Sequence, residues 1–284
     1  MTAVAPGRAA VVPWAHGGHP ADGPGWVPLL PVAVLAVGYL LAAVRDPRGW
    51  DHRRTLAWLA GCTVLAVAVG PLAHLSDDPR GHMAQHLLLG MLAPLGLVLG
   101  APVTLLLHVA PTSTRRRVGR LLRARALHLI AHPVTAALLS TGGLALVLLT
   151  PLYATAERQP ALHHGVHLHY LGAGYLFAWS LAGPDPAPRR PGLAVRVGAL
   201  LGASAGHAAL AKYLYAQAGT LPPGLTDPDA AAFGSAAHLM YYGGDVAELL
   251  LAVALFATWY HRSRPPLVNR SFASRHRDAV TRTS

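Results

Sequence analysis

Apolar residues in this chain are grouped into long blocks, with short polar or charged segments between them. Each block has the roughly 20 residues that an α-helix needs to cross the hydrocarbon core of a bilayer. Backbone exposed to lipid must be hydrogen-bonded within helices, so the pattern predicts an all-α, polytopic integral membrane protein, a seven-transmembrane-helix bundle. The predicted spans are Trp26 to Val44, Thr55 to Leu75, His82 to Val109, Leu127 to Thr150, His163 to Ala182, Ala194 to Tyr215 and Ala236 to Tyr260.

Two of these blocks contain residues that modify a plain helix. The third block is long and includes Pro94, Gly100 and Pro102, which predict a kink or the separation of its last turns. The fifth block contains "YLGAGYLF", whose small residues allow a neighbouring helix to approach closely.

The basic residues are sorted by loop, and this sorting predicts the orientation. Of the 23 Lys and Arg residues, 19 lie in segments 45–54, 111–126, 183–196 and 261–284. By the positive-inside rule these segments are cytoplasmic, so the N-terminus is outside and the C-terminus inside. The net charge of +11 then needs no nucleic-acid partner, because no basic patch is interleaved with base-stacking aromatic residues.

The expected organisation is one membrane domain with two tails, in a bacterial plasma membrane. We expect an extracytoplasmic tail over residues 1–25, the seven-helix domain over 26–262 and a basic cytoplasmic tail over 263–284. No cleavable signal peptide is evident. The single cysteine, Cys62, excludes paired-thiolate metal motifs, so any metal site must use His, Met, carboxylate or Tyr side chains.

Histidines are concentrated in the predicted outer half of the bundle, which holds eleven of the 17. His86 and His167 each lie four residues inside the starts of their spans, roughly 6 Å deep. His207 lies eight residues before Tyr215, and Asp245 nine after Ala236, so both are roughly 12 to 14 Å deep. Side chains from several spans therefore occupy one layer.

Helical spacing places several of these side chains on shared faces, because residues four apart differ by only about 40° around a helix. Such pairs are two-point chelates for copper, zinc or iron. His82 and His86 share a face, as do His163 and His167, and His238, Tyr242 and Asp245 form one stripe with Glu248 beside it. The predicted metal ligands are His82, His86, His163, His167, His207, His238 and Asp245.

Each of these residues also has an ordinary structural explanation. A single histidine near a span end commonly hydrogen-bonds a carbonyl at the interface, and we interpret His128 and His132 in this way. A carboxylate inside a span costs at least about 2.5 kcal/mol and needs a partner. For Asp245 and Glu248 that partner is either a metal site, a helix-packing hydrogen bond or Lys212.

Several motifs resemble those of the polytopic CtaG-type cytochrome c oxidase assembly factors. These motifs are "GHMAQHLLLGMLAPLGLVLGAP", "HLHYLGAGYLFAWSLAGPDPAPRRP", "GHAALAKYLYA" and "LMYYGGDVAELLLAVALFATWY". Together they cover most of residues 70 to 262. Two positions depart from the family pattern: the chain reads "LLTPLY" where many relatives carry Trp-His-x-Pro, and Val166 stands where relatives carry an acidic residue.

The resemblance implies a membrane protein that helps to mature a haem-copper oxidase. By position it assigns metal binding to His82, His86, His163, His167, His207 and Asp245. We therefore expect a non-catalytic copper-binding assembly factor, with zinc or iron as weaker alternatives. It would take copper from a donor on the outer face and pass it to a cytochrome c oxidase subunit. Asp245 would bind the metal or orient an imidazole, and Glu248 would take up displaced protons.

Three other functions remain open from the sequence. One is a zinc-dependent intramembrane hydrolase in which Asp245 or Glu248 is the general base. Another is a haem or redox membrane protein with axial histidines. The last is a transporter that relays protons through buried carboxylates, although no inverted repeat is evident.

Overall fold

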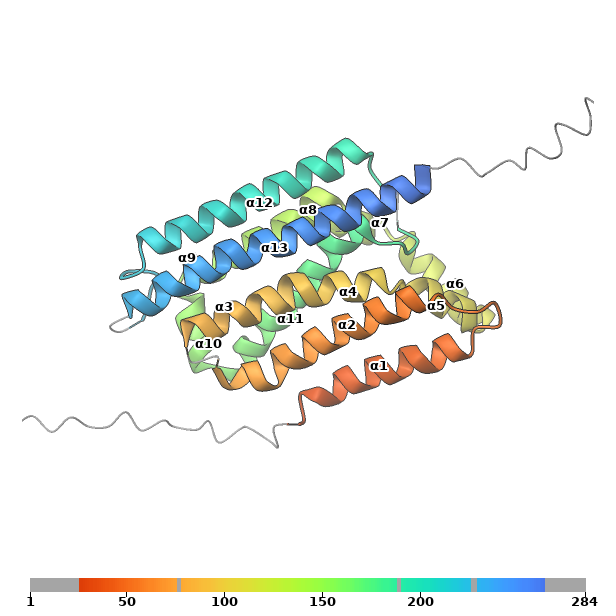
Figure 1. Cartoon of the computed structure of the whole chain (residues 1–284), viewed down its shortest axis with the longest axis horizontal. Coiled ribbons are helices and arrows are strands. Elements are labelled where there is room, and N and C mark those ends of the chain that lie inside the picture. The colour runs from red at the N-terminus through yellow and green to blue at the C-terminus, as the bar shows by residue number, and fades with distance from the viewer. Residues whose placement is uncertain (1–25, 76–77, 188–189, 226–228, 264–284) are drawn as a thin grey trace, which may run out of the picture.

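The computed structural model describes residues 26–75, 78–187, 190–225 and 229–263, and every regular element in them is helical. The long helices lie side by side along the long axis of the molecule (Figure 1). The elements are α1 (Leu29–Val44), α2 (His52–Val69), the 3₁₀ turn η1 (Pro71–Leu75), α3 (Pro79–Leu87), the π-helical turn η2 (Leu88–Leu92), α4 (Ala93–Leu99), α5 (Pro102–Val109), α6 (Thr112–Leu122), α7 (Arg125–Ile130), α8 (Pro133–Ala137), the π-helical turn η3 (Leu138–Gly142), α9 (Gly143–Leu149), α10 (Leu152–Arg158), α11 (Pro160–Ala182), α12 (Leu193–Ala216) and α13 (Ala230–Ser263).

Four helical stretches are long and apolar enough to cross a membrane, or five if a bent pair forms one span. They are His52–Ala73, Pro79–Val109, Leu193–Ala216 and Ala230–Ser263, and the bent pair is Pro133–Leu149 with Leu152–Arg158. The other two predicted spans form helices that fall short of these criteria: α1 has 16 residues, and α11 has 23 but carries four histidines. The chain thus has the helices of a multi-pass membrane protein, while seven crossings remain a prediction. The tails 1–25 and 264–284 lie outside the described residues.

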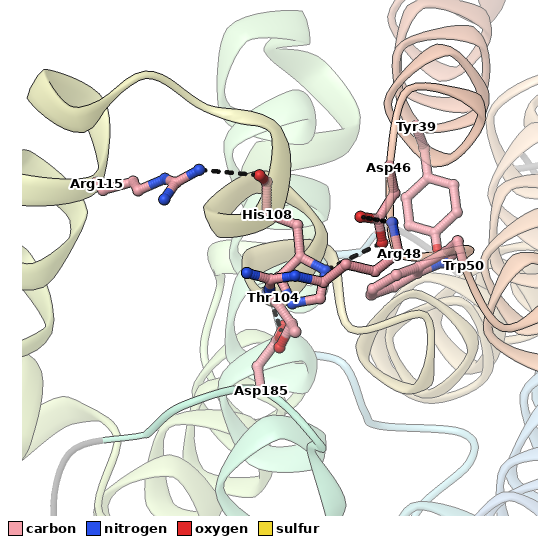
Figure 2. A network of polar contacts seen from close by, with 8 residues as sticks. All are labelled: Tyr39, Asp46, Arg48, Trp50, Thr104, His108, Arg115 and Asp185. Carbon is pink, nitrogen blue, oxygen red and sulfur yellow. Dashed lines mark hydrogen bonds and ion pairs between the residues drawn. The ribbon is translucent and has the colours of Figure 1, made fainter.

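The third predicted span is interrupted where its proline and glycine residues indicated. Proline has no N–H group to donate to the carbonyl four residues earlier, so it weakens the regular α-helical pattern. The π-helical turn η2 ends at Leu92, two residues before Pro94. The chain breaks again at Ala101, which has a left-handed φ of 52°, and Pro102 then starts α5. The buried carboxylate of Asp185 accepts hydrogen bonds from the backbone N–H groups of Val103 (3.1 Å) and Thr104 (2.7 Å), so the new helix N-terminus is capped (Figure 2).

Glycines set the closest helix contacts. A Cβ on Gly61 of α2 would lie 2.6 Å from the backbone nitrogen of Leu97, and one on Gly96 of α4 would lie 2.7 Å from the Cα of Gly61. A Cβ on Gly174, in the "YLGAGYLF" motif of α11, would collide with the backbone of Gly90. The predicted role of the small residues of "YLGAGYLF" in close packing is confirmed at Gly174, and the structure adds Gly61 and Gly96.

The bundle has a His-rich end and an Arg-rich end. The His-rich end carries α3 and α10 at the left of Figure 1, and the Arg-rich end carries α5, α6 and α7 at the right. Helix α1 begins at the His-rich end and α13 finishes at the Arg-rich end. The first and last helices therefore run in the same direction.

Candidate functional site

Helix α3 places two imidazoles inside the bundle. Its N-terminus is capped by Asp78, whose side chain accepts from the backbone N–H of Arg80, and Gln85 Nε2 donates to the carbonyl of Ala68 on α2 (2.9 Å). His82 and His86 are then only 4% and 5% exposed. All four of their ring nitrogens are buried without a hydrogen-bond partner within the described part of the chain. Buried polar atoms in native proteins are almost always satisfied, so these four nitrogens have unused capacity to bind a ligand or water.

The first group of side chains surrounds His82 at the His-rich end. Its ring centroid lies 6.4 Å from that of His163 and 6.1 Å from that of His167, both on α11. The centroids of His163 and His167 are 4.3 Å apart, as expected for residues one turn apart on a helix. Glu157 of α10 brings a carboxylate oxygen to 3.7 Å from His82 Nδ1 and 4.0 Å from His163 Nδ1. We name His82, His163, His167 and Glu157 the outer cluster.

The second group lies one turn further along α3. The ring centroid of His86 is 6.2 Å from that of His207 on α12, and 4.6 Å from that of Tyr170 on α11. Glu248 of α13 has a carboxylate oxygen 3.6 Å from His207 Nδ1, and His207 Nε2 has no hydrogen-bond partner among the described residues. His207 is only 6% exposed. We name His86, His207 and Glu248 the deep cluster.

A small cavity adjoins the deep cluster. Its volume is about 30 Å³, which is space for about two water molecules. Its lining includes His86, His207 and Glu248, together with Ser140 and Thr141 of the π-helical turn η3. The turn η2 contributes Gly90 and Met91 to the same wall. Two π-helical turns thus border one cavity with a mostly apolar lining, and π-helical turns are frequent at functional sites.

Two of the predicted ligands are not part of either cluster. His238 and Asp245 are exposed on the outside of α13. The ring of His238 lies against Tyr215, with centroids 4.5 Å apart. The two residues share a face with Tyr242, as the spacing predicted, but this face points away from the bundle.

The comparison with known families bears directly on this arrangement. The family described as cytochrome c oxidase caa3 assembly factor matches residues 36–262, which include both clusters. The chain belongs to this family.

Mycobacterial proteins are among the curated relatives of the chain. The uncharacterized protein Mb0105 of Mycobacterium bovis is 37% identical over 187 residues, which cover 62% of this chain and 28% of the relative. The uncharacterized protein ML1998 of Mycobacterium leprae is 35% identical over the same length. The chain therefore spans less than a third of the length of the relatives it matches. No solved structure matches it.

The two clusters provide ligand chemistry but not a preformed metal cage. No group of three or more His, Cys, Asp or Glu side chains in the described ranges is arranged to hold an ion. Pairs of imidazole rings come closer to a geometry that could hold one metal ion. A metal about 2.0 Å from an imidazole nitrogen is about 3.2 Å from the ring centre, so two rings on one ion can have centroids about 6.4 Å apart. The pairs His82 with His167 and His86 with His207 meet this limit, at 6.1 and 6.2 Å.

Sequence reasoning missed one residue of the site. Glu157 was not among the predicted ligands, because it precedes the fifth predicted span. The chain bends by 78° between α9 and α10, and this bend turns α10 toward α3 and α11. Val166, which stands where relatives carry an acidic residue, is buried. The carboxylate near His163 comes from Glu157 instead.

Proposed function

We propose that this chain binds copper at its His-rich end and supports copper insertion into a haem-copper cytochrome c oxidase. The observation that carries the proposal is that imidazoles from α3, α11 and α12 converge in two adjacent clusters, one half-buried and one buried. Five of their ring nitrogens have no hydrogen-bond partner among the described residues. The assembly role follows from the family. Metal binding is our inference from the donor set.

Copper fits this donor set better than other common metals. Two imidazoles facing each other across one ion suit Cu(I), whereas structural zinc takes four ligands. Met83 of α3 is buried beside His82 in sequence, and a thioether would also favour Cu(I). With only one cysteine in the chain, transfer through paired thiolates is excluded.

The two clusters divide the proposed task. The outer cluster lies nearer the end of the bundle and would receive copper from a donor on that side. His82 and His86 are one turn apart on α3, so they connect the outer cluster to the deep cluster. Glu157 and Glu248 would hold neighbouring imidazoles in the metal-binding tautomer and accept protons released on binding. In this proposal the protein binds and passes on copper and catalyses no reaction.

Copper content of the purified protein tests the proposal. After loading with Cu(I) in detergent, we expect His86→Ala and His167→Ala each to retain about half of the copper of the unchanged protein, because each removes one of the two clusters. Loss of one ligand from a two-ligand site removes most of the affinity. The measurement is elemental analysis after gel filtration, which also reports whether each variant is folded.

His238→Ala is the matched control, because His238 lies on the same end of the bundle but outside both clusters. We expect its copper content to equal that of the unchanged protein. Full copper content in His86→Ala and His167→Ala, or loss only in His238→Ala, would contradict the proposed site. In cells that lack the protein, oxidase activity should be partly restored by added copper.

A further inference from the structure

One face of α13 is left uncovered by the rest of the chain. Its residues recur at spacings of three and four and lie within a sector of about 80° around the helix. Side chains on this face are well exposed, including Tyr242 at 66%, Leu249 at 66% and Val253 at 59%. We name this face the α13 seam: His238, Tyr242, Asp245, Leu249, Val253, Phe256 and Tyr260.

The seam carries a carboxylate at the middle of the helix. Asp245 is 15 residues from Ala230 and 18 from Ser263, so it lies about 22 Å from one end of α13 and about 27 Å from the other. A bilayer core is about 30 Å thick, and this places Asp245 near its centre. An exposed carboxylate at that depth would face hydrocarbon, where acidic residues are rare and almost always paired.

No cation of the described chain neutralises Asp245. There is no ion pair to it within 4.0 Å among the described residues. Lys212 of the neighbouring α12 is the nearest candidate by sequence, but its Nζ lies over the ring of Tyr241, 5.3 Å from the centroid. The charge of Asp245 acts on the ring of His207, but no described cation forms an ion pair with it, so its carboxylate is open to a cation of a partner.

The seam lies at the same depth as the deep cluster. Gly244, which precedes Asp245, lies against the ring of His207, and a Cβ at this position would collide with that ring. Glu248 follows one turn later and faces His207 Nδ1 at 3.6 Å. A helix that docked on the seam would lie at the same depth as His207, but on the other side of α13 from its ring.

We infer that the α13 seam docks a transmembrane helix of the oxidase subunit that receives the metal, and that this helix presents Arg, Lys or another donor to Asp245. The seam supplies the apolar stripe for helix packing, and Asp245 fixes depth and register. This inference rests on the proposed function for the identity of the partner.

A second copy of the chain fits the seam less well. A two-fold dimer in one membrane brings the same surface of both copies together. Two Asp245 side chains would then meet at the same depth, and like charges repel strongly in a medium of low dielectric constant. Charge complementarity therefore favours a different protein.

Site-specific photo-crosslinking in cells that make the oxidase tests the inference. A photoreactive amino acid at Leu249 or Val253 should crosslink to an oxidase subunit identified by mass spectrometry. The same amino acid at Val34 of α1, which is 70% exposed, is the control and should give none. Asp245→Lys should reduce the seam crosslink at least tenfold, while Asp245→Asn, which still accepts a hydrogen bond, should reduce it less.

Three outcomes would overturn the inference: crosslinks to a second copy, crosslinks to lipid alone, or a seam crosslink that Asp245→Lys leaves unchanged. Copper analysis of the same samples separates this result from the proposed function. His86→Ala should lose copper but keep the crosslink, because docking on the seam does not depend on bound copper. A crosslink to the oxidase with a protein that never binds copper would refute the proposed metal site alone.

Discussion

At the Arg-rich end, single polar side chains hold together segments that are far apart in sequence (Figure 2). The ring nitrogen Nδ1 of His108 lies 3.0 Å from the carboxylate of Asp46, which also accepts from the backbone N–H of Arg48. Trp50 Nε1 donates to the hydroxyl of Tyr39 (2.7 Å), and that hydroxyl donates to the carbonyl of Gly100 (2.7 Å). Because Gly100 precedes the break before α5, these bonds fix the entry to that helix.

The bond between Asp46 and His108 predicts a pH-dependent stability. Hydrogen bonding to His108 lowers the pKa of Asp46 below its ordinary value of 3.8. A lowered pKa stabilises the fold above the unfolded-state value, and this stabilisation is lost as the pH falls through the folded-state value. We expect Asp46→Asn to lower the melting temperature by a few degrees at pH 7, with the difference shrinking below pH 3.8. Melting in detergent measures this, and a difference that stays constant to pH 3 would contradict it.

At the scale of elements, glycine determines how closely helices pack in this bundle. The contact between α2 and α4 depends on Gly61 and Gly96, where an added Cβ would meet backbone atoms that cannot move aside cheaply. In contrast, a methyl group added at Gly202 of α12 would meet no atom of another residue within 4 Å beyond its own stretch of helix. The same residue type thus serves packing at one place and has no packing role at another.

Substitution of these glycines by alanine tests their roles. Gly61→Ala and Gly96→Ala should each destabilise the protein by roughly 1 to 3 kcal/mol, as overpacking does in other cores. Gly202→Ala is the matched control and should be neutral or stabilising by up to about 1 kcal/mol, because alanine is the better helix former. Thermal unfolding of the three variants in one detergent measures the difference. Equal effects at Gly61 and Gly202 would refute the packing argument.

For the whole molecule, the arginines at one end combine two roles. Arg196 Nη1 donates to the carbonyl of Leu181 (3.0 Å), Arg190 Nη2 to that of Asp185 (2.9 Å), and Arg262 Nη2 to that of Gly183 (3.1 Å). They bind the carbonyls at and beyond the C-terminus of α11, where cations are favourable. Burial, and then the neighbouring Arg262 and Arg196, lower the pKa of Arg190 to about 10, so it stays charged at neutral pH. The same charges also predict a cytoplasmic location for this end.

Thiol labelling of intact cells tests the orientation. In a Cys62→Ala background, Thr220→Cys at the His-rich end should react with a membrane-impermeant maleimide from outside. Ser113→Cys at the Arg-rich end should react only after the cells are permeabilised. Both positions are exposed, so accessibility within the protein does not limit the reaction. Labelling of Ser113→Cys in intact cells would show that the predicted orientation is reversed.

The sequence by itself determined the helical segments and which residues share a helix face. Apolar blocks of span length predicted α2, the broken third span, α12 and α13, and helical periodicity paired His82 with His86 and His163 with His167. These features are local, since they depend on residues within a few turns of one another. The prolines and glycines of the third span likewise act on their own backbone.

Only the tertiary structure decided which face of each helix turns inward and which distant segments meet. The seam and the opposite face of α13 are both largely apolar, so hydropathy does not distinguish them. Small residues such as Gly244 and Ala247 determine which face of α13 turns inward, because they let the helix approach His207. For the same reason Asp245 points outward and Glu248 lies at the site, and the bend before α10 brings in Glu157 from outside any predicted span. Such contacts depend on the shapes of several helices at once, and no single stretch of sequence contains them.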